Sequence, residues 1–316
     1  MRTLITGAAG FIGGFLSEAL IKKGDEVCGA IRGTESTKHL SKEVDIRECD
    51  IGVYEEFENL IEDCKPERIF HLAAQSFPTI SYAKPKETFR TNVEGAINLF
   101  EILKKRELNP LVLITGTSGE YGLTLADPKY LNVPPAEDAP LRPVHPYGIS
   151  KAAKEMLAIN YYANYNLRTI VARLFNTIGP RKEGDLPSDI AKQIVHIERE
   201  EQEPVLHLGN LKAKRAYADV RDVANALILL SDKGTPGEVY NLCSRNVLSV
   251  KEMVDLFLDK SYAKSIKVEV AQDRLRPYDE PIIWGDCSKL EKATGWQPEI
   301  PIQKTVEDIL NFWRKN

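Results

Sequence analysis

Long hydrophobic runs are missing from this 316-residue sequence. No apolar stretch approaches the roughly 18 residues that a membrane-spanning helix needs. The first apolar segment lies at the very start of the chain, with no charged and hydrophobic leader ahead of it. We therefore expect neither a signal peptide nor a transmembrane span, no contact with a membrane, and a cytoplasmic protein.

Cysteine and histidine are scarce, with five residues of each type. The histidines do not cluster, and the cysteines are scattered without a C-x-x-C pair, at Cys28, Cys49, Cys64, Cys243 and Cys287. Zinc sites depend on such clusters, so we expect no metal site. Cysteines without a pairing pattern also favour a reducing compartment, in which all five stay reduced.

A strong excess of one charge is absent as well. The 42 lysine and arginine residues nearly balance the 46 aspartate and glutamate residues, and the net charge is −4. No long basic run interrupts this balance, so we expect no nucleic-acid partner. An anionic ligand would have to be held by a few local arginines.

The sequence does contain a glycine-rich turn close to its start. The apolar pair Leu4-Ile5 leads into Gly7, Gly10 and Gly13, which are spaced G-x-x-G-x-x-G, and an amphipathic helical pattern follows. A second strand is expected at residues 26–31. Within this strand–turn–helix–strand context, such glycines permit close approach of a pyrophosphate to the free N–H groups of the helix. We therefore predict a dinucleotide-binding turn.

The end of the second strand indicates which dinucleotide binds. NAD-binding proteins usually carry an acidic residue there, whereas an arginine accommodates the 2′-phosphate of NADP. Here Arg32 and Gly33 follow the strand, and no carboxylate occurs until Glu35. NADP is therefore the expected cofactor. NAD stays open as the alternative, in which Arg32 is only a solvated loop charge.

Tyr147 and Lys151 form a second pattern with chemical meaning. Four residues are about one helical turn, so both side chains lie on one face of a helix that we expect over residues 145–164. A free tyrosine has a pKa of about 10, and a neighbouring ammonium group lowers that pKa. The pair is therefore a candidate proton-transfer device.

Strand-like and helix-like segments alternate through the first half of the chain. Strands are expected at residues 68–72, 111–115 and 169–172, and a long helix at 85–106. This alternation predicts an α/β fold with a Rossmann-type doubly wound parallel sheet. We expect an NADP-binding Rossmann domain over residues 1–172, with a returning segment at about 219–243 that includes a buried strand near 238–241. Residues 173–316 are expected to form mainly a smaller substrate-binding lobe, with helices at 187–201, 219–231, 250–258 and 303–313.

Taken together, these motifs resemble those of the extended short-chain dehydrogenase/reductases that modify nucleotide sugars. The resemblance covers essentially the whole chain, and the matching segments are 6–13, 50–51, 71–76, 117–122, Tyr147 with Lys151, 173–176 and 295–298. Within that group the sequence looks closest to the GDP-mannose 4,6-dehydratases and the GDP-4-keto-6-deoxymannose reductases. The resemblance implies a nucleotide-sugar substrate linked to GDP, and a homodimer.

This resemblance also implies roles for individual residues. A hydride would pass between the nicotinamide and carbon 4 of the hexose, while Tyr147 exchanges the proton on the 4-oxygen. Lys151 would lower the tyrosine pKa and bind the nicotinamide ribose, and Thr117 would bind the 4-oxygen. Cofactor contacts are implied for Gly7, Gly10, Phe11, Ile12, Gly13, Arg32, Asp50, Ile51, Leu72, Ala73, Ala74, Tyr147 and Lys151. Substrate contacts are implied for Gln75, Ser76, Asn176, Arg181, Arg215 and Arg276, where arginine suits the geometry of phosphate.

One departure from the family pattern bears on the reaction. A 4,6-dehydratase needs a base for the carbon-5 proton, and the resemblance places a glutamate for this step where the sequence has Gly119. Ser118 and Glu120 are the neighbouring candidates, but adjacent side chains of an extended chain point to opposite faces. We therefore expect a reductase of a GDP-4-keto-6-deoxyhexose. A GDP-mannose 4,6-dehydratase is the main alternative, and a nucleotide-sugar 4-epimerase or a non-catalytic dinucleotide sensor are further ones.

Overall fold

The computed structural model describes residues 1–275 and 279–316. A seven-stranded sheet forms its centre, with the strand order β10-β6-β5-β4-β1-β2-β3. Neighbouring strands in this sheet pair in parallel. The strands are β1 (Arg2–Thr6), β2 (Glu26–Ile31), β3 (Asp45–Glu48), β4 (Arg68–His71), β5 (Leu111–Thr117), β6 (Thr169–Leu174) and β10 (Val239–Leu242). The expected Rossmann-type doubly wound sheet is confirmed.

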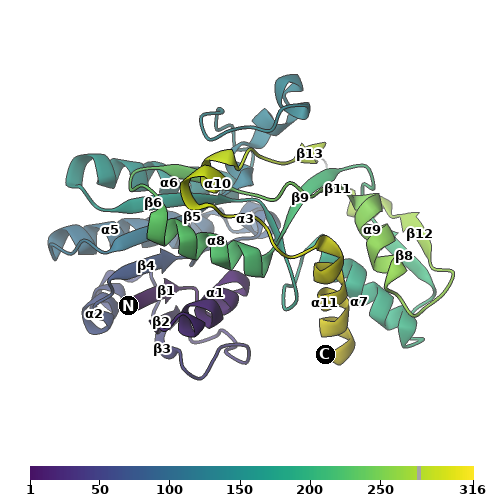
Figure 1. Cartoon of the computed structure of the whole chain (residues 1–316), viewed down its shortest axis with the longest axis horizontal. Helices are drawn as coiled ribbons and strands as arrows, with labels where there is room; N and C mark the ends of the chain where they lie inside the picture. The colour runs from purple at the N-terminus through teal and green to yellow at the C-terminus, as the bar shows by residue number, and fades with distance from the viewer. Residues whose placement is uncertain (276–278) are drawn as a thin grey trace.

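Helices cover both faces of this sheet (Figure 1). One face carries α1 (Phe11–Lys22) and α8 (Val220–Lys233). The other face carries α2 (Tyr54–Cys64), α5 (Gly95–Lys105) and α6 (Pro146–Tyr165). Consecutive strand residues point to opposite faces, so Leu4 packs in one core and its neighbour Ile5 in the other. Burial on both faces explains why the central strand β5 begins with a continuous apolar run.

The chain leaves the sheet after β6 and returns to it at β10, which pairs with β6. The buried strand that was expected near residues 238–241 is therefore confirmed. The chain leaves the sheet at the carboxyl end of β6, which lies beside the carboxyl end of β5. In open parallel sheets, ligands bind beyond the carboxyl ends of the strands. This edge is thus the place to examine for a functional site.

A separate group of helices and short strands stands beside the sheet (Figure 1). Its helices α7 (Leu186–Glu198), α9 (Val250–Asp259) and α11 (Ile302–Lys315) pack around a third hydrophobic core. Its strands are β7 (Asn176–Ile178), β8 (Val205–Leu208), β9 (Lys214–Asp219), β11 (Val247–Ser249), β12 (Lys267–Val270) and β13 (Ile282–Ile283). We propose that this group is the substrate-binding lobe, which residues 173–316 mainly form. The sheet, together with the returning segment at about 219–243, would be the NADP-binding domain of residues 1–172. In the part of the chain that the structure describes, no helix is long and apolar enough to cross a membrane.

The long helix expected at residues 85–106 is interrupted in the structure. It consists of α4 (Pro85–Phe89), a π-helical turn at Arg90–Glu94, and α5. Asn92 lies buried in this turn, where its amide donates to Ser150 Oγ of α6 at 2.9 Å and its oxygen accepts from Gln75 N at 2.8 Å. A π turn adds one residue to the helix, and a hydrophobic period cannot reveal such a local insertion.

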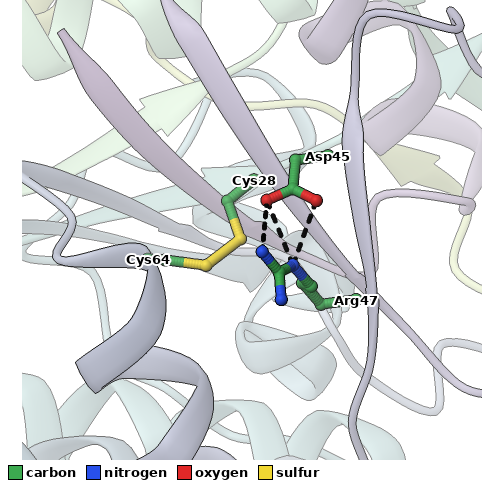
Figure 2. Close-up of a disulfide and its surroundings, with 4 residues drawn as sticks. All are labelled: Cys28, Asp45, Arg47 and Cys64. Atoms are coloured by element: carbon green, nitrogen blue, oxygen red, sulfur yellow. Dashed lines mark hydrogen bonds and ion pairs between the residues drawn. A yellow bond between two sulfur atoms is a disulfide. The ribbon is translucent and has the colours of Figure 1, made fainter.

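Cys28 in β2 and Cys64 at the end of α2 form a disulfide (Figure 2). They are 36 residues apart in the sequence, but α2 packs on the face of the sheet toward which Cys28 points, so their Cα atoms lie 6.4 Å apart. Figure 2 also shows the ion pair of Asp45 and Arg47 on the adjacent edge strand β3. The expectation that all five cysteines are reduced is wrong for this pair, whereas Cys49, Cys243 and Cys287 are free thiols.

Candidate active site

The glycine turn between β1 and α1 leaves no room for a side chain at Gly7 or Gly13. Gly7 has a φ of +73°, and a Cβ atom there would lie 3.0 Å from the backbone of Ala73. A Cβ atom at Gly13 would lie 2.3 Å from the carbonyl oxygen of Gly7. Gly10 precedes α1 without a side-chain cap, and the first turn carries no acidic residue. The open N–H groups of that turn, which includes Phe11 and Ile12, therefore fit the pyrophosphate of a dinucleotide.

Other expected cofactor residues line the same edge of the sheet. Leu72, Ala73 and Ala74 are half-buried directly after β4, and Ala73 N donates to Thr6 Oγ1 at 3.2 Å. Asp50 follows β3 and accepts from Gly52 N and from Arg90 Nη2, both at 2.9 Å. Burial favours a higher pKa for the Asp50 carboxyl, but these hydrogen bonds outweigh it and lower that pKa. Asp50 is therefore ionised at neutral pH, with the buried Ile51 beside it.

Arg32 lies exposed directly after β2. Its only described ion pair is a long one, in which Nε lies 3.4 Å from Glu35 Oε1. The Arg32 side chain is 58% exposed, so little holds it in place. A loosely held arginine at this position is free to turn toward a 2′-phosphate.

Three of the expected catalytic residues meet at the carboxyl end of β5. Thr117 is the last residue of β5 and is hydrogen-bonded to Tyr147 in the first turn of α6. Lys151 lies one turn further along α6, with Nζ 5.8 Å from the centre of the Tyr147 ring. Lys151 Nζ donates to the carbonyl oxygen of Thr115 at 2.9 Å. The helix and the strand thus bring two hydroxyl groups and one amino group together.

Burial sets the protonation states of this group. It raises the pKa of Tyr147 to about 12, although the hydrogen bond with Thr117 acts in the opposite direction. It also lowers the pKa of Lys151 to about 8. The net pKa of Tyr147 is raised because desolvation of the phenolate dominates, and the lowering expected from Lys151 stays a prediction. The Tyr147 hydroxyl is protonated at neutral pH.

Glu120 is turned into the interior of the protein. It has no exposed surface, and Oε1 accepts from the backbone N–H of Thr117 at 2.7 Å. Oε2 lies 3.6 Å from Arg173 Nε, whose guanidinium binds both oxygens of Glu155. Burial and the nearby Glu155 raise the pKa of Glu120 well above its usual value. Ser118 is also buried, in the short 3-10 turn that begins after Thr117.

The expected substrate residues near the sheet differ in their surroundings. Asn176 begins β7, and its buried Nδ2 has no hydrogen-bond partner in the part of the chain that the structure describes. Gln75 is held by Asn92 through its backbone, and Ser76 is exposed. A buried amide donor without a partner is costly, so Asn176 is well placed to bind a ligand oxygen.

The two expected arginines that the structure describes, Arg181 and Arg215, bind different acidic residues. Arg181 binds Glu18 Oε1 at 2.6 Å and lies over the ring of Phe15, so it packs against α1. Arg215 in β9 binds Asp279 Oδ1 at 2.6 Å and the carbonyl oxygen of Glu280 at 2.8 Å. Each has its own acidic partner, which would have to release the guanidinium before it could bind a phosphate. Arg276 lies outside the described residues.

His145 is a neighbour of the site that the sequence motifs do not single out. Its Nδ1 accepts from Gly148 N at 2.8 Å and so caps α6, a position where serine, threonine, aspartate or asparagine is usual. Its ring stacks with Tyr147 at a centroid distance of 5.8 Å. A Cβ atom at Gly119 would lie 3.1 Å from His145 Cε1, so the imidazole occupies the space beside this glycine. The unusual cap ahead of Pro146 is the signal that could have found it.

Lys154 is a second residue near the site that the sequence motifs do not single out, and it follows Lys151 by about one turn of α6. Its side chain has no exposed surface, and Nζ has no hydrogen-bond partner among the described residues. Positions 147, 151 and 154 follow the spacing i, i+4, i+7, which places their side chains on one helix face. That spacing could have drawn attention to it, because lysine is rarely buried without a partner.

The arrangement can transfer a proton to or from an oxygen held beside a bound dinucleotide. Tyr147 and Thr117 present hydroxyl groups at the carboxyl end of β5, at the same edge of the parallel sheet as the glycine turn that follows β1. Among the described residues, no group of three histidine, cysteine, aspartate or glutamate side chains could hold a metal ion.

Comparisons with known proteins reveal relatives over the whole chain. A sequence family described as GDP-mannose 4,6 dehydratase matches residues 4–309. The GDP-6-deoxy-D-mannose reductase of Pseudomonas aeruginosa is 31% identical over 251 residues, which cover 78% of this chain and 80% of that protein. GDP-mannose 4,6 dehydratase 2 of Arabidopsis thaliana is 28% identical and covers 98% of this chain and 85% of its own length. The solved structure of RMD from Pseudomonas aeruginosa, complexed with NADPH, matches with a TM-score of 0.87 and 26% identity over 100% of this chain and 99% of that one.

Proposed function

The chain belongs to the GDP-mannose 4,6-dehydratase family of nucleotide-sugar-modifying enzymes, and from this membership we propose that it is an NADP-dependent reductase of a GDP-4-keto-6-deoxyhexose. The reaction would reduce the ketone at carbon 4 to a hydroxyl group. Within this family, both reductases and dehydratases occur among the relatives. The choice between them therefore depends on the residues of this site.

The observation that carries the proposal is the position of Glu120. Elimination of water from carbons 5 and 6 needs a base at the sugar, and Gly119 cannot supply one. Glu120 has no exposed surface, accepts from Thr117 N and lies beside Arg173 in the interior. Its raised pKa also favours the protonated carboxyl group, which cannot take up a proton from the sugar. Hydride and proton transfer at carbon 4 remain feasible without it.

The protonation state of Tyr147 also favours reduction of a ketone at carbon 4. With a pKa of about 12, its hydroxyl carries its proton at neutral pH and can donate it to a ketone oxygen. Thr117 would bind the same oxygen from the end of β5. When bound, NADPH supplies the hydride. Lys151 holds a positive charge next to the tyrosine ring, which stabilises the phenolate that remains after the proton has moved.

NADP is the cofactor that the residues support. The turn at Gly7, Gly10 and Gly13 fits a pyrophosphate, and Arg32 is exposed at the position that meets the 2′-phosphate. The structurally similar RMD from Pseudomonas aeruginosa is complexed with NADPH. Net reduction of a ketone also consumes a reduced dinucleotide, which suits NADP.

A GDP-mannose 4,6-dehydratase is the second candidate, because the matching family carries that description. This activity would require another group to remove the carbon-5 proton, or Glu120 to leave the contacts with Thr117 and Arg173. His145 is the titratable side chain that lies against Gly119. A dehydratase would therefore depend either on a displaced Glu120 or on His145 in place of a carboxylate.

Incubation with two substrates separates these candidates. One sample contains the protein with GDP-mannose alone, and the other contains GDP-4-keto-6-deoxymannose with NADPH; products are identified by mass. We expect oxidation of NADPH and a gain of two hydrogens in the second sample only, and a Tyr147→Phe variant should lose this turnover. Loss of water from GDP-mannose without added NADPH would contradict the proposal.

A further inference from the structure

Two polar side chains lie opposite each other on the short strands β7 and β9. These strands pair in parallel, and Asn176 of β7 is the register partner of Tyr217 of β9. Adjacent strands lie about 4.8 Å apart, and residues in register point to the same face of the sheet. The pairing of β7 with β9 therefore places an amide and a phenol side by side.

The polar atoms of both side chains lack a partner. Asn176 Nδ2 and the Tyr217 hydroxyl are buried and have no hydrogen-bond partner among the described residues. Tyr217 is only 3% exposed, and burial raises its pKa to about 12, so its hydroxyl keeps the proton at neutral pH. Both groups can therefore donate a hydrogen bond. Buried donors without a partner destabilise a folded protein, and two of them at neighbouring positions indicate a bound ligand.

The same face of β9 also carries a positive charge. Side chains two residues apart on a strand share a face, so Arg215 lies on the face of Tyr217. Ala213 follows the same alternation and packs in the third hydrophobic core together with Tyr217. The Arg215 guanidinium is held by Asp279 Oδ1 at 2.6 Å, an anion that a phosphate oxygen would replace. One guanidinium and two neutral donors on a single face suit a phosphate group.

This face begins close to the catalytic group. Leu174 of β6 is the register partner of Thr117, and Asn176 follows Leu174 by two residues. Two residues of extended chain span roughly 7 Å. In a nucleotide sugar the diphosphate is attached to carbon 1, across the ring from the carbon 4 at which Thr117 and Tyr147 would act. The diphosphate is thus expected about one sugar ring away from the catalytic group, and Asn176 lies at such a separation.

We propose that Tyr217 is a specificity-determining residue, whose hydroxyl donates to a phosphate oxygen of the nucleotide sugar together with Asn176 and Arg215. This assignment rests on the proposed nucleotide-sugar substrate. It does not depend on the direction of the reaction, because a reductase and a dehydratase would hold the same diphosphate. Sequence motifs point to Asn176 and Arg215 but not to Tyr217, since no local pattern separates a core tyrosine from one whose hydroxyl binds a ligand.

Thermal stability distinguishes this role of Tyr217 from a structural one. The hydroxyl is unpaired in the ligand-free protein, so Tyr217→Phe removes a destabilising group and keeps the ring in the core. The variant should unfold at the same temperature as the unsubstituted protein or at a higher one. A hydroxyl that binds a buried water molecule would instead contribute to stability, and its removal would lower the unfolding temperature. A lowered temperature with unchanged ligand binding would overturn the proposal.

The main test measures binding of GDP and of guanosine by calorimetry. The protein is saturated with NADPH, so that neither probe can bind at the glycine turn. In Tyr217→Phe we expect the Kd for GDP to rise about tenfold or more, because a hydrogen bond to a charged group is lost. The Kd for guanosine, which has no phosphate, should stay the same. An unchanged Kd for GDP, or an equal rise for both probes, would overturn the proposal.

Tyr240→Phe is the matched control. Tyr240 in β10 is 2% exposed, and its hydroxyl accepts from Thr235 N at 3.0 Å. Loss of this bonded hydroxyl should lower the unfolding temperature and leave the Kd of both probes unchanged, which is the opposite of the pattern expected for Tyr217→Phe.

Turnover gives a second readout. Tyr217→Phe should raise the KM for the nucleotide sugar with little change in kcat, because the hydroxyl would contact the phosphate and not carbon 4. A fall in kcat at constant KM would overturn the proposal. If the unsubstituted protein does not bind GDP, the proposed GDP-linked substrate is contradicted, and the same comparison of UDP with uridine then decides the role of Tyr217.

Discussion

Burial controls the chemistry of individual residues at the carboxyl end of β5. Tyr147 keeps its proton because its phenolate would be desolvated, and Lys151 holds its charge less firmly than an exposed lysine for the same reason. The sequence alone suggests a lowered pKa for Tyr147, because the spacing of Tyr147 and Lys151 shows only that an ammonium group is near. Whether a group is desolvated depends on strands and turns from other parts of the chain.

At the residue scale, the pH dependence of stability should reveal Lys154. The unfolded chain keeps a proton on this lysine up to about pH 10.5, whereas the folded chain releases it at a much lower pH. Unfolding therefore takes up one proton in this interval, and the free energy of unfolding rises with pH by about 1.4 kcal/mol per unit from this group.

Chemical denaturation of Lys154→Met across this pH range measures the effect. The variant should lose that slope and be more stable than the unsubstituted protein near neutral pH, because an unpaired buried amine is gone. An unchanged slope would mean that Lys154 is protonated in the folded protein.

Arg32 provides a prediction about the cofactor. In Arg32→Asp we expect the preference for NADP over NAD to fall by about tenfold or more, because a hydrogen bond to a charged group contributes about 1.5–3 kcal/mol. Binding of both dinucleotides is measured by fluorescence titration. Arg168→Asp, an exposed arginine before β6, is the matched control. A preference that does not change in Arg32→Asp would remove this residue from 2′-phosphate recognition.

At the scale of elements, the sequence predicts what local periodicity determines. The second strand was expected at 26–31 and is observed as Glu26–Ile31, and the buried strand near 238–241 is observed as Val239–Leu242. The π turn at Arg90–Glu94 and the contact of Arg181 with α1 depend on packing between distant segments, which no local pattern encodes. The same holds for the site. Its motifs are local and can be predicted, whereas the burial of Glu120 and Lys154 depends on distant segments and cannot.

The disulfide between β2 and α2 should stabilise the sheet. It closes a loop across a separation of 36 residues, for which chain entropy predicts a contribution of up to about 4 kcal/mol. We expect Cys28→Ser to lower the free energy of unfolding by an amount within this limit, as measured by denaturant titration. Cys49→Ser removes a free thiol and serves as the control. Alkylation of five thiols in the intact protein would contradict the disulfide.

At the scale of the whole molecule, α6 carries apolar side chains on the surface as well as the catalytic pair. Met156 is 59% exposed and Ile159 is 38% exposed, and Ile97 of α5 is 36% exposed. An apolar patch on two neighbouring helices is typical of an interface between subunits. We therefore expect a homodimer that buries this face.

Light scattering coupled to size-exclusion chromatography measures the mass of the protein in solution and so tests for a dimer. The unsubstituted protein should have twice the 35.5 kDa mass of one chain, and Met156→Lys should shift it toward the monomer. Val270→Lys, an exposed apolar residue in β12, is the control and should not change the mass. A monomer at every concentration would contradict the expected dimer.

The central claim is that this protein reduces a ketone at carbon 4 of a nucleotide sugar. Its most direct test uses GDP-4-keto-6-deoxymannose and NADPH that carries deuterium at the transferable position. The account predicts a product with one deuterium at carbon 4, seen by NMR, and no such product with Tyr147→Phe. No deuterium at carbon 4, together with loss of water from GDP-mannose in a parallel sample, would contradict it.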